Sequence, residues 1–221
     1  MKINEIFYSI QGEGRYIGLP MAFIRVTGCN LRCRWCDTKY AYEDGQELSF
    51  DAILERLTKF PTKRVCVTGG EPMSQDRINE LMNQLINHGF TIYLETNGSI
   101  FLGVLPRSDA IKISMDVKCP SSGEAQKMNF TNFELLGEGD QIKFIILNQD
   151  DYDYAKNILQ KYPVPDGCAI IFTPCAAEHG EEQEMVFSLR TLTEHVLKDG
   201  LFVQVLPQLH KLIWPEKNKG I

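Results

Sequence analysis

Residues 28–42 read GCNLRCRWCDTKYAY and contain three cysteines, Cys29, Cys33 and Cys36, at the spacing C-x3-C-x2-C. They follow residues 22–27 (AFIRVT), an apolar and β-branched run that predicts a buried strand. Closed tetrahedral metal sites and disulfide frameworks use cysteines in even numbers or complete the set with histidine, and this segment holds neither a fourth cysteine nor a histidine. The stretch therefore predicts a site that uses three thiolates and leaves a coordination position open.

Similar apolar runs alternate along the chain with amphipathic stretches. Further strands are predicted at residues 64–68, 91–95, 110–114, 141–147, 169–172 and 202–206, and helices at 51–60, 77–88, 152–162 and 183–198, with Asp150 and Asp151 at the N-cap of the third helix. Strands that alternate with helices predict βαβ units and a largely parallel sheet. About seven strands are too few for the eight-stranded barrel. We therefore expect an α/β fold, a partial (incomplete) TIM-like barrel of about six or seven mostly parallel strands with helices outside.

Polar segments follow several of the predicted strands. They are Gly69-Gly70-Glu71-Pro72, Thr96-Asn97-Gly98, Met115-Asp116-Val117-Lys118 and Thr173-Pro174-Cys175. Because ligands gather at the carboxyl ends of parallel strands, we expect one site at this edge, together with the cysteine loop. Residues 120–139 are polar and predict an insertion or a lid rather than a domain boundary.

Composition excludes several classes of protein. The 221 residues carry a formal net charge of −6, which argues against binding nucleic acid by phosphate neutralisation. No run of about 18 apolar residues predicts a membrane span, and the N-terminal MKINEIFYSIQGEG does not resemble a signal peptide. Seven cysteines, unevenly spread, do not suit a secreted disulfide scaffold. We expect a cytoplasmic protein with reduced thiols.

Three interpretations compete for the cysteine cluster. Inert buried cysteines are disfavoured because Arg32 and Arg34 alternate with the thiols. Structural zinc would need a distant fourth ligand, such as Cys66 or His88. The residues favour a [4Fe–4S] cluster with one open iron, whose negative charge Arg32, Arg34 and Lys39 would offset.

The cysteine motif, with Trp35 before its last cysteine, resembles the signature of the radical S-adenosylmethionine (SAM) superfamily. Gly69-Gly70-Glu71-Pro72 is similar to the superfamily's G-G-E-P segment, although alone it could be a turn. The resemblance implies a single radical SAM domain over residues 1–221. It also implies that SAM binds the open iron and, after reduction, supplies a 5′-deoxyadenosyl radical that abstracts hydrogen from the substrate.

Three stretches narrow the resemblance: IQGEG (residues 10–14), FIRVTGCNLRCRWCDT (23–38) and VLPQLHKLIW (205–214). Together they resemble the 7-carboxy-7-deazaguanine synthase family, lyases on the route to queuosine and related 7-deazapurines. The resemblance implies conversion of 6-carboxy-5,6,7,8-tetrahydropterin to 7-carboxy-7-deazaguanine with loss of ammonia, and a requirement for Mg²⁺. It further implies a homodimer that receives electrons from a donor such as flavodoxin or ferredoxin.

The resemblance also implies roles for individual residues. Cys29, Cys33 and Cys36 would ligate the cluster, Thr38 would bind Mg²⁺, and Ile10, Gln11, Gly12, Arg25 and Thr68 would contact the pterin. SAM would be held by Trp35, Cys36, Asp37, Gly70, Asp116, Val117, Lys118, Thr173, Pro174, Cys175 and Ala176. Several relatives have Ser-Pro-Lys where this chain has Asp116-Val117-Lys118, so Asp116 would take the role toward the ribose hydroxyls.

Alternatives remain open at single positions and for the whole chain. Arg25 could instead form a salt bridge at a strand end, Glu13 could bind a pterin amide or be a solvated turn residue, and His210 could close over the substrate or form a strand-end hydrogen bond. Cys119 and Cys175 are expected to be unligated. The rival functions are another small radical SAM enzyme, such as a glycyl-radical-enzyme activase, and a non-catalytic zinc-binding interaction module.

Overall fold

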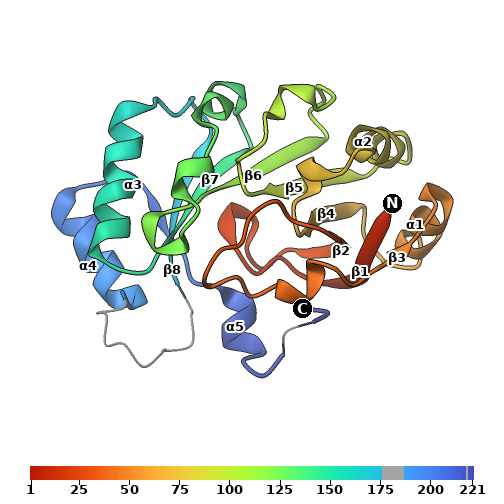
Figure 1. Ribbon diagram of the computed structural model, residues 1–221, viewed down its shortest axis with the longest axis horizontal. Helices are drawn as coiled ribbons and strands as arrows, with labels where there is room; N and C mark the ends of the chain where they lie inside the picture. Colours follow the sequence, from red (N-terminus) through yellow and green to blue (C-terminus); the bar gives the residue numbers. More distant parts are fainter. Residues whose placement is uncertain (176–186, 218) are drawn as a thin grey trace.

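The computed structural model describes residues 1–175, 187–217 and 219–221. In these ranges one sheet of nine strands has the order β3-β1-β2-β4-β5-β6-β7-β8-β9 (Figure 1). The strands are β1 (Lys2–Ile10), β2 (Pro20–Val26), β3 (Gln46–Glu47), β4 (Arg64–Gly69), β5 (Thr91–Thr96), β6 (Ile111–Val117), β7 (Gln141–Ile146), β8 (Ala169–Pro174) and β9 (Gln204–Val205). Strand β2 and strands β4 to β9 are parallel, whereas β1 pairs antiparallel with β2 and β3. The predicted mostly parallel partial barrel is confirmed.

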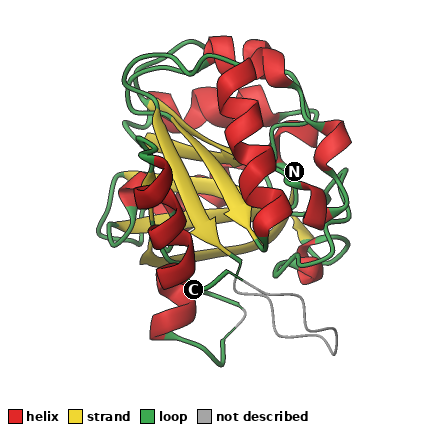
Figure 2. Cartoon of the chain, turned by 90° about the vertical axis from the view of Figure 1, so that its left-hand side faces the viewer, coloured by secondary structure: helices red, strands yellow, loops and turns green. Residues whose placement is uncertain are grey.

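Four helices of the described chain cover the outer side of the curved sheet (Figures 1 and 2): α1 (Phe50–Leu57), α2 (Ile78–Asn87), α3 (Gln149–Lys161) and α4 (Leu189–Asp199). A fifth helix, α5 (Leu209–Ile213), follows β9. The apolar stripe of α2, with Leu81 and Leu85 fully buried, packs into the same core as Val67 and Leu94 of the sheet. Since this outer layer holds most of the core, the opposite face of the sheet is available for polar side chains.

Strand β1 was missed from the sequence. Its residues KINEIFYSI lack strict alternation because a bulge between Ile3 and Glu5 shifts the register with β2. The segment IQGEG begins at Ile10, the last residue of this strand. From there the chain crosses the inner face: Arg15 donates to the carbonyls of Asp140 and Gly167, each at 3.1 Å, and the Tyr16 hydroxyl donates to Gly139 at 2.8 Å. These contacts close the amino-terminal end of the barrel.

Some element boundaries differ from the prediction. The N-cap of α3 is Asn148, whose side chain accepts from the Asp151 amide, so the prediction of Asp150 and Asp151 there is wrong. The Asp151 carboxylate instead accepts from the amides of Ser121 and Leu147, at 2.9 and 3.0 Å. Residues 183–186 of the fourth predicted helix lie outside the described residues, and α4 begins at Leu189 behind the N-cap Ser188.

Residues 120–139 pack against the core. They form short 3₁₀ turns in which Ser122, Asn132 and Phe133 are almost completely buried. Asn132 donates to the carbonyls of Gly98 and Ile100 and accepts from Leu102, which fixes the loop after β5. The segment is therefore a packed connection rather than a lid. Among the described residues, no helix is both long and apolar enough to cross a membrane.

Candidate functional site

The cysteine loop and the Gly-Gly-Glu-Pro turn meet at the carboxyl ends of β2 and β4. The Gly70 amide donates to Val26 at 3.0 Å, and the Glu71 amide donates to Gly28 at 2.7 Å. A Cβ at position 70 would overlap the carbonyl oxygen of Gly28, so only glycine lets the two backbones come this close. The turn thus fixes the start of the cysteine loop.

The three cysteines of the loop are free and half-buried. Burial raises the pKa of the Cys29 and Cys33 thiols, the neighbouring thiols raise it further, and the Lys118 ammonium opposes this effect. Within residues 1–175, 187–217 and 219–221, no three Cys, His, Asp or Glu side chains converge where one metal ion could be held. A structural zinc ion needs such convergence, whereas a [4Fe–4S] cube binds each thiolate through a different iron. Three free thiols on one loop are the donors that such a cluster takes.

Trp35 of this loop lies near Lys118, the residue after β6. The Lys118 ammonium is 5.7 Å from the centroid of the Trp35 ring and 3.0 Å from Asp116 Oδ2. Over the described part of the chain, Trp35 Nε1 and Thr173 Oγ1 are buried polar atoms without a hydrogen-bond partner. Since buried polar atoms are normally paired, these two are available to a bound ligand. Both belong to the predicted SAM-binding set.

The remaining predicted SAM contacts differ in how much of each residue is available to a ligand. Val117 is buried in the outer core, so only its backbone is available to the site. Pro174 ends β8, and Cys175 is buried directly behind it, with its amide bonded to Ile146. Ala176 lies outside the described residues.

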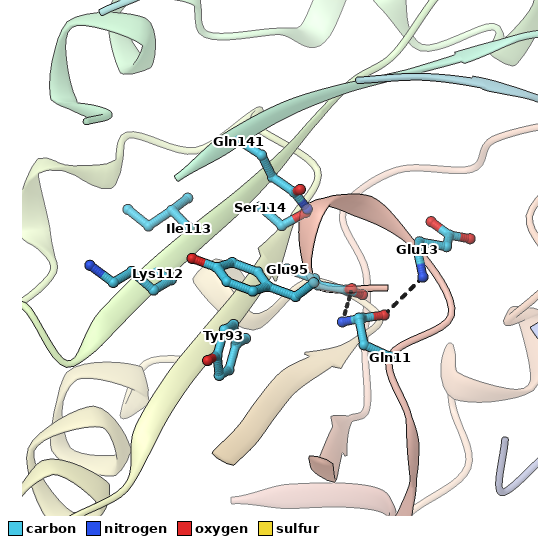
Figure 3. A pocket seen from close by; sticks show the side chains of 9 residues that line it. Gln11, Glu13, Tyr93, Glu95, Lys112, Ile113, Ser114 and Gln141 are labelled. Carbon is cyan, nitrogen blue, oxygen red and sulfur yellow. Dashed lines mark hydrogen bonds between the residues drawn. The ribbon is translucent and has the colours of Figure 1, made fainter. Parts of the chain in front are cut away.

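A hydrogen-bonded group of polar residues lies on the inner face of the sheet. The Glu95 carboxylate accepts from Gln11 Nε2 at 3.1 Å and from Thr68 Oγ1 at 2.9 Å. Gln11 also accepts from the Glu13 amide at 3.2 Å, and these residues face a small pocket (Figure 3). The structure therefore brings the predicted pterin contacts Gln11 and Thr68 together through Glu95, which the sequence analysis did not single out.

A buried charged chain borders this group. The Lys143 ammonium pairs with Glu13 and lies 3.1 Å from Asp116 Oδ1, while Gln208 donates to the other Glu13 oxygen at 2.6 Å. Burial would raise the pKa of Glu13, but the Lys143 charge lowers it below its ordinary value. Glu13 is thus not a solvated turn residue. The signal in the sequence that could have found Lys143 and Glu95 is a single charged side chain inside a strand of otherwise uncharged residues.

Arg25 forms the salt bridge that the sequence left open. Its Nε lies 2.7 Å from Glu5 Oε1, and its guanidinium also lies over the rings of Phe7 and Tyr40. The Tyr40 hydroxyl donates to the same Glu5 oxygen at 2.9 Å. The salt bridge does not test whether Arg25 also contacts the substrate, and that contact stays a prediction.

The C-terminal helix α5 covers the other end of the inner face. The Leu209 amide donates to the Gly12 carbonyl at 2.8 Å, and a Cβ at position 12 would overlap the His210 ring. His210 Nε2 and Lys211 Nζ lie 4.0 and 3.7 Å from Asp37 Oδ2, and the Thr38 hydroxyl donates to Asp37 Oδ1 at 2.8 Å. The His210 ring thus packs over Gly12, and its closure over the substrate stays a prediction. Ile10 ends β1, where it pairs with Pro20.

Comparisons with known proteins agree with this arrangement. The family model described as the Radical SAM superfamily matches residues 23–130. The 7-carboxy-7-deazaguanine synthase of Koribacter versatilis is 36% identical over 100% of both chains, and that of Thermoplasma acidophilum is 36% identical over 97% of both. The enzyme of Methanospirillum hungatei is 38% identical over 96% of this chain and 85% of its own.

Solved structures support the same fold. The crystal structure of QueE from Escherichia coli matches with a TM-score of 0.69, covering 95% of this chain and 94% of that one at 22% identity. Streptococcus suis SuiB bound to S-adenosylmethionine matches with a TM-score of 0.55 at 12% identity, covering 84% of this chain and 51% of that one. With full-length relatives above 30% identity, a partial barrel and three free thiols beside the Gly-Gly-Glu-Pro turn, the chain belongs to the 7-carboxy-7-deazaguanine synthase family of radical SAM enzymes.

Proposed function

We propose that the protein converts 6-carboxy-5,6,7,8-tetrahydropterin to 7-carboxy-7-deazaguanine with loss of ammonia, as a carbon–nitrogen lyase in 7-deazapurine biosynthesis. The observation that carries the proposal is that Thr68, which donates to Glu95, lies two residues before Gly70, whose backbone packs against the start of the cysteine loop. A glycyl-radical-enzyme activase offers no reason for IQGEG and PQLH to meet, whereas here the Gly12 carbonyl bonds the Leu209 amide.

The cofactor side of the site would be held by the cysteine loop. Cys29, Cys33 and Cys36 would ligate a [4Fe–4S] cluster, and Trp35 and Thr173 would offer their unpaired polar atoms to SAM. When bound, the cluster and SAM supply one-electron chemistry that yields a carbon-centred radical. The task of the chain is to hold one substrate C–H bond next to that radical and to exclude water.

The pterin side would be formed by the inner-face residues. Pterins present adjacent ring N–H donors, and carboxylates such as Glu95 accept such donors strongly. Gln11 and Thr68 hold the two Glu95 oxygens in place, so the acceptor is fixed before substrate arrives. Arg25 would bind the substrate carboxylate bidentately after partly leaving Glu5.

A magnesium ion at Thr38 is part of the proposal. The Thr38 hydroxyl lies 2.8 Å from Asp37 Oδ1. Hydroxyl and carboxylate oxygens suit a hard cation such as Mg²⁺, which completes its coordination shell with water and substrate. The ion would orient the substrate and neutralise its carboxylate rather than carry electrons.

Partners complete the proposal. Electrons would come from flavodoxin or ferredoxin, which would dock where the cysteine loop exposes Arg34 and Lys39. We further propose that the enzyme is a homodimer that acts in the cytoplasm and binds neither nucleic acid nor membrane.

The test is anaerobic reconstitution followed by mass spectrometry of the product formed from 6-carboxytetrahydropterin with SAM, Mg²⁺ and reductant. Formation of 7-carboxy-7-deazaguanine without net loss of SAM is expected. Unchanged pterin with accumulating 5′-deoxyadenosine would mean a radical enzyme with another substrate. Colourless protein that carries zinc would overturn the enzyme assignment.

A further inference from the structure

Asn97 lies directly after β5, at the carboxyl end of the sheet, and only 7% of its surface is exposed. Its Nδ2 lies 3.9 Å from Cys29 Sγ and 2.9 Å from Asn30 Oδ1. A primary amide carries two N–H groups, so Asn97 can donate to Asn30 and to the thiolate at the same time. Its side chain therefore reaches the cysteine loop from another strand of the sheet.

The orientation of the Asn97 amide is fixed by its neighbours. Its Oδ1 accepts from the Ser99 amide at 3.0 Å and from the Ser99 hydroxyl at 2.6 Å. Backbone N–H groups only donate, so Oδ1 must face Ser99 and the NH₂ group must face Asn30 and Cys29. Asn30 Nδ2 in turn donates to Ser99 Oγ at 2.8 Å, which closes a ring of hydrogen bonds.

The backbone of Asn97 is held by the Gly-Gly-Glu-Pro turn. Its amide donates to Glu71 Oε2 at 2.6 Å, and the other Glu71 oxygen accepts from Thr96 Oγ1 at 2.7 Å and from the Met73 amide at 2.9 Å. Glu71 is fully buried, so these bonds are shielded from water. The distance between Asn97 and Cys29 is thus set by two loops that are tied together.

Cys29 receives a second N–H donor, the Leu31 amide, at 3.4 Å. Hydrogen bonds to the sulfurs are among the factors that set the potential of an iron–sulfur cluster. They stabilise the reduced cluster more than the oxidised one, because reduction adds negative charge to the thiolate sulfurs.

We propose that Asn97 raises the reduction potential of the [4Fe–4S] cluster by donating an N–H···S hydrogen bond to the Cys29 thiolate. The proposal rests on the cluster of the proposed function and adds a positioning and tuning role for a residue that is not a ligand. Without this donor, the cluster accepts its electron less readily, and reductive cleavage of SAM slows.

The test is an EPR-monitored redox titration of the reconstituted enzyme, with iron and sulfide analysis of each sample. Asn97→Leu removes both N–H groups, and Asn97→Asp keeps the acceptor toward Ser99 while adding a negative charge. Both variants should retain wild-type iron and have a more negative midpoint potential, with the larger shift in Asn97→Asp. The matched control is Asn132→Ala, since Asn132 supports the same loop through Gly98 and Ile100 and belongs to the segment packed beneath it.

Each other outcome is decisive. Unchanged potentials in both Asn97 variants, or an equal shift in Asn132→Ala, would overturn the proposal. Loss of iron from both Asn97 variants while Asn132→Ala retains it would make Asn97 a structural residue and also overturn the tuning role. A wild-type enzyme that takes up no cluster would refute the proposed function instead.

Discussion

The Lys143 ammonium lies between two carboxylates, paired with Glu13 on one side and 3.1 Å from Asp116 Oδ1 on the other. Glu13 belongs to the segment that follows β1, whereas Asp116 is near the end of β6. The Lys143 side chain is only 4% exposed, so one buried charge joins the predicted pterin region to the predicted SAM region.

Replacement of Lys143 by methionine should destabilise the protein strongly. Glu13 would lose its buried ammonium partner and Asp116 one of its two, and breaking a buried ion pair typically costs about 3–5 kcal/mol in the free energy of unfolding. Urea denaturation would measure the loss. Lys59→Met is the matched control, because Lys59 pairs with Glu55 on the surface and its loss should change stability by less than about 0.5 kcal/mol. Equal losses in the two variants would contradict the prediction.

Stability should fall in acid partly through Glu13. The folded state lowers the pKa of this carboxyl below its ordinary 4.5, so the unfolded chain binds a proton more readily. The stabilisation is therefore complete above pH 4.5 and is lost as the pH falls through the folded-state pKa. Urea midpoints measured between about pH 6 and pH 3 should decline less steeply in Glu13→Gln than in the wild type. Parallel curves would show that Glu13 makes no contribution.

Gly70→Ala should damage the cofactor side of the site. The added methyl group would overlap the Gly28 carbonyl, and such crowding costs about 1–3 kcal/mol while it shifts the cysteine loop. We expect a lower melting temperature and weaker SAM binding in calorimetry. At Gly137 an added Cβ meets no atom within 4 Å, so Gly137→Ala should leave both properties unchanged.

Replacement of a cysteine in the cysteine loop should reduce iron binding, whereas replacement of a cysteine outside the loop should not. Cys33→Ser removes a ligand of the proposed cluster and should abolish the brown chromophore and most of the bound iron after anaerobic reconstitution. Cys168→Ser changes a thiol just before β8, whose Sγ contacts the carbonyl of Ala169, and should bind iron as the wild type does. Equal iron content in both variants would refute the ligand assignment.

Thr38→Ala should raise the Mg²⁺ concentration needed for half-maximal activity while the cluster spectrum stays unchanged. The reason is that the variant loses an oxygen donor beside Asp37 but keeps every thiol. Thr38→Ser retains the hydroxyl and should restore the wild-type Mg²⁺ dependence. Loss of the iron–sulfur chromophore in Thr38→Ala would contradict this division of roles.

The regular parts of the fold could be predicted because their signals are local. The run Arg64–Gly69 and the amphipathic helix Ile78–Asn87 agree with the predicted ranges to within one residue at each end. Strand β1 could not be recognised, since its bulge breaks the alternation on which the prediction depends. The N-cap of α3 was misplaced because Asp150 and Asp151 are capping residue types too, and only the contacts with Ser121 and Leu147 explain why Asp151 is not the cap.

By itself, the sequence determined the alternation of strands and helices, the three thiols and the family. Each of these depends on the spacing of residues within a short segment of the chain. The tertiary structure alone decided which polar groups meet. Glu13 pairs with Lys143 across 130 positions, and Asn97 reaches Cys29 across 68. The physical reason is that the register of parallel strands and the path of the closing loops bring distant residues together, and no local pattern specifies either.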